Sequence, residues 1–234
     1  MGLLDRLLGS ANVNYEGGPQ VAKARTTTVP FTLPPLPWKE NALAPVISAD
    51  TVRLHHEKHH KGYVDNLNRL VADSPLSELP LEDLVRYVAD TPDQKAVFDN
   101  AVEAWNHAFY WQSLAPHGGG RPAGVVSWKI DHDFGGYDTF KQQLTHAALR
   151  QSASGWLWLV HEGDMLRVRR TANAETPMVQ GRTCLLAIDV CEHAYSLDYH
   201  NRRAAYVEAV IDKLLNWHFA AQQFAQAESE HFVG

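Results

Sequence analysis

The sequence has few cysteines, no long apolar run and no excess of basic residues, and each shortage excludes a class of protein. Only Cys184 and Cys191 occur among 234 residues, too few for a disulfide framework or a cysteine-rich zinc module, so the cytoplasm is the expected location. No stretch approaches the roughly 20 apolar residues of a spanning helix, and residues 1–10 lack the pattern of a signal peptide. With 21 basic and 27 acidic residues, we do not expect a nucleic-acid-binding protein.

Apolar and histidine side chains are what the sequence has in abundance. Hydrophobic residues make up 45% of the chain, including seven tryptophans. This is enough to bury the core of one large domain or two smaller ones, so we expect a globular protein. Thirteen histidines are the one compositional excess, and most lie near other polar or aromatic motifs.

The first 30 residues are predicted to be an extension and linker. Residues 1–10 place their leucines on one side of a short amphipathic helix, which is too short to be stable alone. Residues 11–28 show no periodicity and are typical of a linker. Two interpretations stay open for residues 1–10: an unpacked tail, or a segment that docks onto a protein partner or a compartment shell.

A proline-rich, extended segment leads into a long predicted helix, for which Ser48 or Asp50 is the expected N-cap. Within this helix His55, His59 and Tyr63 recur every four residues, so all three lie along one stripe. A lone histidine on a helix usually has no ligand role. The repeated motif HHEKHH is less easily dismissed.

The rest of the chain is predicted to be helical at first and mixed afterwards, with the change at the glycine-rich loop over residues 116–124. The predicted elements are helices over 81–87 and 94–114, a helix pair over 134–150, strands over 155–160, 165–171 and 183–189 with a hairpin turn at 161–164, and helical structure over 202–230.

Half a metal site stands out in the stretch DVCEHAY. Asp189 offers a carboxylate and His193 an imidazole four residues later. If Asp189 ends a strand and His193 begins a helical turn, both can point at one ion, and this pair suits iron, manganese or zinc. A second candidate ligand is His107, because a histidine on a buried aromatic helix face needs a hydrogen bond or a metal for its nitrogens.

Five blocks of the chain together resemble the iron/manganese superoxide dismutases over residues 31–227. The blocks are FTLPPLPW…ALAP, TVRLHHEKHHKGYVDNLN, AVEAWNHAFYWQSLAP, SGWLWLV and DVCEHAYSLDY, in the family's order and spacing. The resemblance implies an α+β fold. Residues 1–30 would be the extension, residues 31–116 an N-terminal α-helical hairpin domain, and residues 117–234 a C-terminal α/β domain with a three-stranded antiparallel sheet.

The resemblance also implies a metal ion and a reaction. One iron or manganese ion per chain would lie between the two domains and convert superoxide into dioxygen and hydrogen peroxide. The ligands carried over to this sequence are His55, His107, Asp189 and His193.

Four further residues match family positions around the metal. Tyr63 would belong to the proton relay, His59 would stand at the gateway, and Trp156 would form the pocket wall. Glu192 would reach across a subunit interface and bond a ligand histidine of the partner, which implies a homodimer or a dimer of dimers.

Glu103 departs from the family pattern. Iron-type members place a glutamine here, whose amide donates a hydrogen bond to the metal-bound solvent, and manganese-type members supply that amide from a position that is Ala174 in this chain. The missing second glutamine slightly favours iron. An ionised Glu103 can only accept hydrogen bonds, whereas a protonated one would imitate the glutamine. We predict that Glu103 raises the reduction potential and slows turnover.

Two more positions depart from the family motif. Cys191 replaces a tryptophan, which is either a small buried hydrophobe or an oxidisable sulfur near a peroxide-producing metal. Ser196 replaces a tyrosine, which would loosen the gateway. Two other interpretations therefore stay open: a weakly active or inactive metal-binding protein that acts as scaffold, sensor or interaction subunit, and hydrolytic chemistry with Glu103 as general base.

Overall fold

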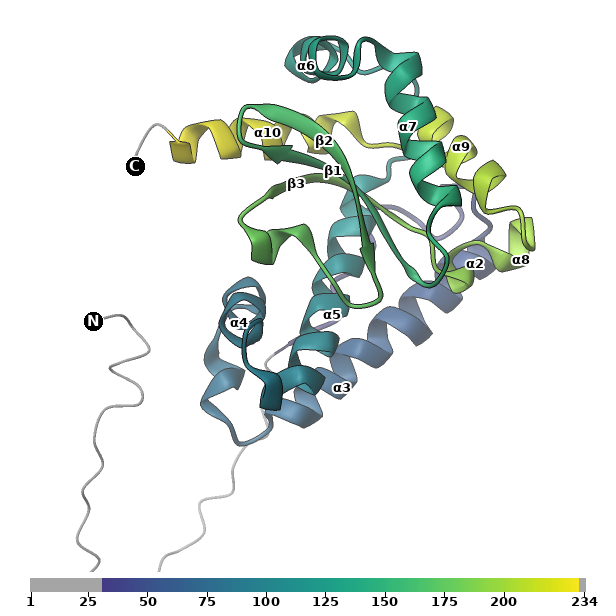
Figure 1. The fold of residues 1–234 in the computed structure, drawn as a ribbon. Helices are drawn as coiled ribbons and strands as arrows, with labels where there is room; N and C mark the ends of the chain where they lie inside the picture. Colours follow the sequence, from purple (N-terminus) through teal and green to yellow (C-terminus); the bar gives the residue numbers. More distant parts are fainter. Residues whose placement is uncertain (1–30, 232–234) are drawn as a thin grey trace, which may run out of the picture.

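The structure, a computed structural model, describes residues 31–231 and consists of two parts (Figure 1). One part is a helical hairpin and the other is a small sheet surrounded by helices. The helix predicted over residues 1–10, the linker after it and the proposed docking role all lie outside the described residues.

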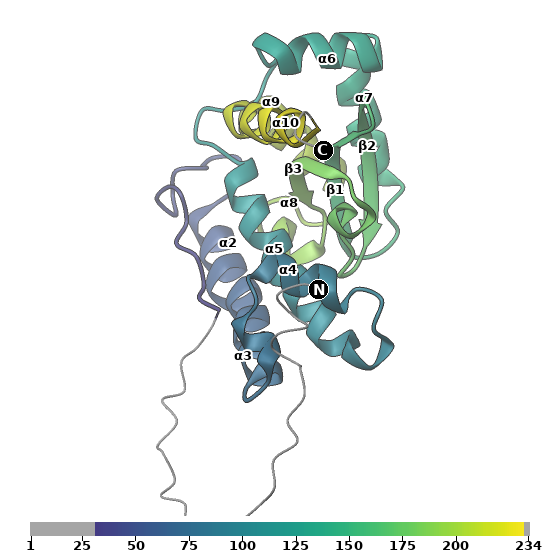
Figure 2. The ribbon, with the colours of Figure 1, turned by 90° about the vertical axis from the view of Figure 1, so that its left-hand side faces the viewer.

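The first part is the helical hairpin that the sequence predicts. Its elements are α2 (Ala49–Leu54), the π-helix η1 (His55–His60), α3 (Lys61–Val71), η2 (Pro75–Glu78), α4 (Leu81–Val88), η3 (Pro92–Gln94) and α5 (Lys95–Ser113). The first three form one continuous helix, and α3 and α5 lie side by side (Figure 2). Of the two expected N-caps, Ser48 is the one observed: its hydroxyl accepts a hydrogen bond from the backbone N–H of Thr51 at 3.2 Å.

The motif HHEKHH forms the π-helix, which the sequence did not predict. The N–H of Lys61 bonds to the carbonyl of His56, one residue further back than in an α-helix. The wider turn leaves His55 and His60 buried together, while His59 stays exposed. π-Bulges of this kind are frequent at functional sites.

The second part is the predicted α/β domain with a three-stranded antiparallel sheet in the order β2-β1-β3. Its elements are α6 (Gly124–Phe134), α7 (Tyr137–Leu149), β1 (Gly155–Glu162), β2 (Met165–Ala172), η4 (Pro177–Gln180), β3 (Thr183–Asp189), η5 (Glu192–Ala194), α8 (Ser196–Tyr199), α9 (Arg203–Lys213) and α10 (Trp217–His231). The predicted α+β fold is therefore confirmed.

The helix pair begins ten residues earlier than predicted, because α6 starts at Gly124 rather than Phe134. Val125 and Trp128 of α6 are exposed, and these apolar residues obscure in the sequence the buried stripe formed by Val126, Ile130 and Phe134. It ends at Gly135, whose φ of 77° is the left-handed conformation that glycine adopts at a helix C-cap.

Two other boundaries also differ from the prediction. The strands β1 and β2 extend to Glu162 and Met165, so the hairpin turn is only Gly163-Asp164 instead of residues 161–164. The helical region over 202–230 is interrupted between α9 and α10. There Leu215 pairs with Leu114, and the N–H of Asn216 bonds to the carbonyl of Ser113, so these residues pair with the end of α5 instead of continuing a helix.

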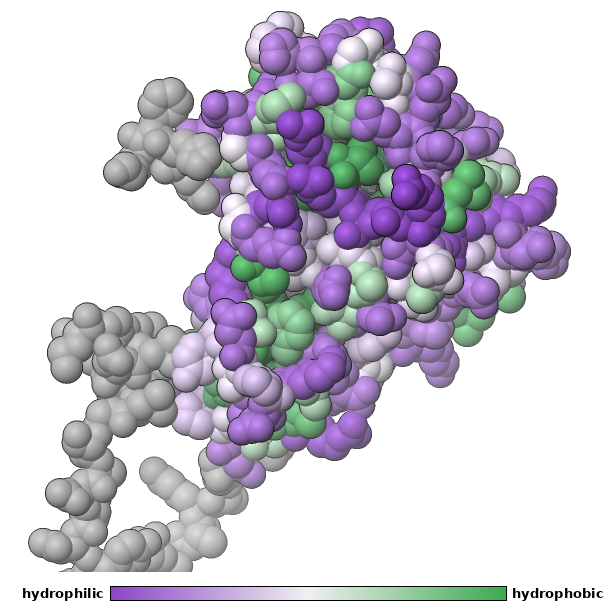
Figure 3. Space-filling model, in the orientation of Figure 1, coloured by the Kyte–Doolittle hydropathy of each residue, from purple (hydrophilic) through white to green (hydrophobic). Residues whose placement is uncertain are grey.

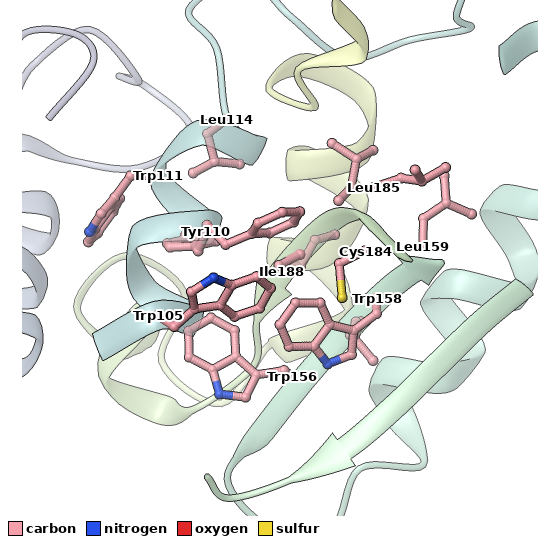
Figure 4. Close-up of a cluster of buried hydrophobic side chains, with 14 of the residues drawn as sticks. Trp105, Tyr110, Trp111, Leu114, Trp156, Trp158, Leu159, Cys184, Leu185 and Ile188 are labelled. Carbon is pink, nitrogen blue, oxygen red and sulfur yellow. The ribbon is translucent and has the colours of Figure 1, made fainter. Parts of the chain in front are cut away.

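The core lies where the sheet meets α5. Helices α5 and α10 pack against β3, whereas α6 and α7 pack against β2 (Figure 2). Trp156 and Trp158 of β1 are fully buried and lie close to Trp105 and Tyr110 of α5 (Figure 4). These large apolar side chains hold the two parts together, since aromatic residues bury the most surface per residue.

Strand register brings Asp189 to the junction between the two parts. Asp189 is the last residue of β3 and pairs with Trp156 near the start of β1. The chain then turns into η5, which carries His193. Asp189 thus ends a strand and His193 lies in a helical turn, the arrangement in which both side chains can point at one ion.

Most of the face in Figure 3 is hydrophilic, with apolar residues scattered between polar ones. Within residues 31–231, no helix combines the length and the apolar composition needed to cross a bilayer.

Candidate metal centre

Four side chains from both parts of the chain converge on one point. His55 of η1, His107 of α5, Asp189 at the end of β3 and His193 of η5 place one ligand atom each within 4.8 Å of all the others. Three of the four are buried, and the side chain of His193 is 21% exposed. The three imidazoles surround Oδ2 of Asp189: the Nε2 atoms lie 3.0 Å (His55), 3.1 Å (His193) and 3.8 Å (His107) away.

The arrangement leaves nitrogen lone pairs free for a metal. The Nδ1–H of His107 donates to the carbonyl of Glu103 at 2.7 Å, which fixes the proton on Nδ1. The Nε2 atoms of His55 and His107 are buried and make no hydrogen bond within the described residues. Buried nitrogens are rarely left unpaired, so these two atoms fit a cation beside Asp189.

A backbone hydrogen bond orients the carboxylate of Asp189. Its Oδ1 accepts a hydrogen bond from the backbone N–H of Cys191 at 2.8 Å, which turns Oδ2 toward the imidazoles. Burial alone would raise the pKa of Asp189, but His193 and His55 outweigh burial and hold this pKa well below its usual range. The group is therefore an anionic ligand.

Burial also keeps two of the histidines neutral. It lowers the pKa of His55 to about 4 and that of His107 well below its usual range. The pKa of His193 is raised, because the attraction of Asp189 exceeds the effect of burial. One carboxylate with neutral imidazoles is a donor set that suits iron and manganese.

The other predicted site residues surround this cluster. The ring of Tyr63, in α3, lies 5.3 Å from that of His107, and the ring of His59 stacks on His193 at 4.1 Å. Trp156 is fully buried, and its ring lies 5.0 Å from His107.

Comparison with known proteins gives a consistent result. Residues 30–115 match the alpha-hairpin domain of the iron/manganese superoxide dismutases, and residues 122–223 match their C-terminal domain. A superoxide dismutase of Synechocystis marked Fe is 46% identical over 84% of this chain and 99% of its own length. One from Synechococcus elongatus, also marked Fe, is 45% identical over 84% and 98%. One from Rickettsia bellii, marked Mn/Fe, is 42% identical over 84% and 94%.

This chain belongs to the iron/manganese superoxide dismutase family. The predicted family resemblance is therefore confirmed by both domains and by relatives matched over nearly their whole length.

Glu103 is the unusual polar group of this family member. Its side chain is 10% exposed, and its Oε2 lies 3.5 Å from Nδ1 of His107. Burial and the nearby charge of Asp189 raise the pKa of Glu103 to about 8. In the metal-free cluster the carboxyl is therefore mostly protonated at neutral pH.

Cys191 is held as a packed, hydrogen-bonded side chain. Its Sγ accepts from the N–H of Gly155 at 3.3 Å and faces the Gly155 carbonyl at 3.7 Å. Burial raises the pKa of the Cys191 thiol. Because the thiolate is the reactive form, this geometry favours the small buried hydrophobe over the oxidisable sulfur.

One hydrogen-bonded pair near the site was not recognised in the sequence. His60 is buried, its Nδ1 accepts from Nε1 of Trp111 at 3.1 Å, and its Nε2–H donates to the carbonyl of Ala104 at 3.0 Å. These two bonds fix η1 to α5 on either side of His107, at Ala104 and Trp111. The HHEKHH repeat together with a tryptophan on the facing helix was the available signal.

We predict that the pH dependence of stability in metal-free protein depends on Glu103. A carboxyl whose pKa rises from 4.5 to about 8 on folding binds its proton more tightly in the folded state. Its stabilisation is present below the unfolded value and is lost as pH rises through the folded value. Glu103→Gln should remove this loss, which amounts to at most about 1.4 kcal/mol per pH unit. Urea unfolding across this pH range measures the difference between the two proteins.

The matched control is Glu208→Gln on the exposed surface of α9. It should follow the stability–pH profile of the unchanged protein. That profile also contains the contribution of histidines that are buried in the neutral form, whose sign is opposite to that of Glu103. Parallel profiles for the unchanged protein and Glu103→Gln would mean that Glu103 does not titrate in this range.

Proposed function

We propose that the protein is a superoxide dismutase whose iron or manganese ion is held by His55, His107, Asp189 and His193. The observation that supports this most directly is the pair of unbonded, buried Nε2 atoms of His55 and His107 facing one carboxylate oxygen. When bound, the ion supplies a centre that cycles between two oxidation states, taking an electron from one superoxide and giving it to another. A cation also attracts the superoxide anion.

The surrounding side chains serve orientation and proton supply. The Glu103 carbonyl holds the tautomer of His107, and the Cys191 N–H holds Asp189. Burial and the nearby Glu103 carboxyl raise the pKa of Tyr63, so its hydroxyl keeps its proton until a stronger base such as a reduced oxygen species accepts it. Tyr63 is therefore the proton donor, and His59, exposed and stacked on His193, stands at the entrance.

Iron is the ion we favour. Ala174 is half-buried against the core, and its methyl side chain has no amide that could donate to a metal-bound solvent. The cytoplasm is the location that we propose, because both Cys184 and Cys191 are free thiols.

Iron-loaded protein should consume superoxide faster than manganese-loaded protein, and Asp189→Ala should lose both metal and activity. Removing the only anionic ligand should weaken metal binding by more than the roughly 10- to 100-fold seen for outer-sphere partners. Metal analysis and a superoxide-consumption assay on the same samples measure both effects.

The matched control is Asp212→Ala, which removes an aspartate that is 43% exposed and pairs with Lys141. It should retain metal and activity. Protein that is fully loaded with either ion yet consumes no superoxide would support the inactive scaffold instead.

Glu103→Gln should lower the reduction potential of the iron-loaded protein and raise its turnover. A nearby cation favours the ionised carboxylate, which can only accept hydrogen bonds and so favours bound water over hydroxide, whereas an amide donates. A tenfold change in this balance corresponds to about 59 mV for one electron. Redox titration measures the shift, with Glu208→Gln as control, and an unchanged potential and rate would defeat the idea.

We also propose that the protein forms at least a homodimer through the surface around Glu192. Glu192 is exposed in the single chain, as are the apolar side chains of Leu54 (42%) and Leu197 (55%). The segments that bear them are joined, because Asp198 accepts from the N–H of Ser48 at 2.9 Å and the hydroxyl of Thr51 at 2.8 Å. One continuous face is thus available for a second copy.

Glu192→Ala should shift the protein toward monomer, since the carboxylate would lose its partner across the interface. Sedimentation velocity over a dilution series measures the change, with Glu208→Ala as the matched surface control. If the unchanged protein sediments as a monomer at every concentration, the dimer does not form.

A further inference from the structure

Three indole rings lead away from the metal centre in near contact. Figure 4 shows the three indoles of Trp156, Trp158 and Trp105 close together. Between ring centroids, Trp156 lies 5.0 Å from His107, Trp158 lies 6.0 Å from Trp156, and Trp105 lies 6.1 Å from Trp158. These separations are within the range of direct aromatic contact. Indoles are also among the side chains most easily oxidised by one electron, so an electron can pass between them in short steps.

The row of three indoles ends at a groove. Trp105 is 8% exposed and lines a groove of about 830 Å³ between the two parts of the molecule, together with Glu82, Arg86, Phe109, Met178 and Phe219. A small molecule in this groove can therefore reach Trp105.

Of the two outer indoles, Trp105 is better able than Trp158 to hold a positive charge. Its Nε1–H donates to Oε1 of Glu82 at 3.0 Å, whereas that of Trp158 donates to the neutral hydroxyl of Thr171 at 2.9 Å. A hydrogen bond to a charged acceptor becomes stronger when the donor is a cation. Trp156 lies nearest to the bound metal cation, whose repulsion moves a positive charge outward along the chain.

Two other aromatic paths begin at the centre but end without a charged acceptor. Trp111 lies 4.8 Å from His55 and 6.1 Å from Trp38, and the Trp38 indole donates to the backbone carbonyl of Leu114. Tyr110 and Tyr206 bond to each other through their hydroxyls at 2.9 Å. A tyrosine gives up its proton on oxidation, and this hydroxyl pair includes no base to receive it.

We propose that Trp156, Trp158 and Trp105 form a relay that carries an oxidising equivalent from the metal centre to the groove. This rests on the proposed function, which supplies a reduced metal ion and hydrogen peroxide in one site. The peroxide takes one electron from the reduced ion and one from Trp156, and two protons from solvent convert it into two water molecules. The ion ends one charge higher, and Trp156 becomes a radical cation.

The electron deficit then moves outward. Trp158 gives an electron to Trp156, and Trp105 gives one to Trp158, which leaves the radical cation on Trp105 beside Glu82. A one-electron reductant of the ascorbate class in the groove restores Trp105. The relay therefore protects the ligand histidines from oxidation by the enzyme's own product.

The test adds hydrogen peroxide to reduced, iron-loaded protein and locates oxidised tryptophan by peptide mass spectrometry. Oxidation should concentrate on Trp105, although it is only 8% exposed, and should spare Trp128, which is 60% exposed. Ascorbate should suppress it. A freely diffusing oxidant would instead attack Trp128 first, and oxidation that stays on Trp156 or favours Trp38 would also overturn the relay.

Two variants probe the path. Trp158→Phe should reduce Trp105 oxidation to the level of metal-free protein, and Glu82→Gln should reduce it about tenfold, because a neutral acceptor stabilises the cation less. The control Trp38→Phe should leave Trp105 oxidation unchanged. Glu82 lies on the groove wall, so its substitution tests the relay even if Trp158→Phe fails to fold.

Superoxide consumption is measured on the same preparations. Both Glu82→Gln and Trp38→Phe should consume superoxide at the unchanged rate. If Trp105 is oxidised but the protein consumes no superoxide, the proposed function is contradicted and the relay is supported. If the protein consumes superoxide but neither Glu82→Gln nor Trp158→Phe changes Trp105 oxidation, the proposed function is supported and the relay is contradicted.

Discussion

A buried carboxylate surrounded by imidazoles is the constraint on which the rest of this structure depends. Asp189 is fully buried and ionised, and an isolated buried charge is very costly. His55 and His107 are neutral, and of the three imidazoles only His193 has a raised pKa, so a bound cation would compensate this charge further. Each part supplies two of the four candidate ligands, so metal binding would add to the packing that holds the two parts together.

The fold meets this constraint with backbone devices on both sides. The register that sets Asp189 opposite Trp156 fixes the carboxylate at the end of the sheet, and the π-turn of η1 brings His55 and His60 inward together. His60 then locks that turn to α5 through Trp111. Groups outside the ligand set thus hold His55, His107 and Asp189, which is how a site reaches accurate geometry.

The sequence predicted the parts of this site that depend on local periodicity. The spacing of Asp189 and His193 predicted half of the cluster, and the family blocks supplied His55 and His107, which the structure places beside them. The π-turn could not be predicted, because HHEKHH fits an α-helix equally well and only packing on α5 decides between them. Helix α6 was missed for a related reason: exposed Val125 and Trp128 disguise its buried face.

The structure accommodates Cys191 and Glu103, the two buried departures from the expected family pattern, in different ways. Cys191 is buried and its sulfur accepts a hydrogen bond from the N–H of Gly155, so the fold accommodates the cysteine through hydrogen bonding and packing. Glu103 differs, because its carboxyl lies beside His107 and its pKa responds to the charge of Asp189. We therefore propose that the protonation of Glu103 follows the charge of the bound ion, so that proton uptake at Glu103 accompanies electron transfer.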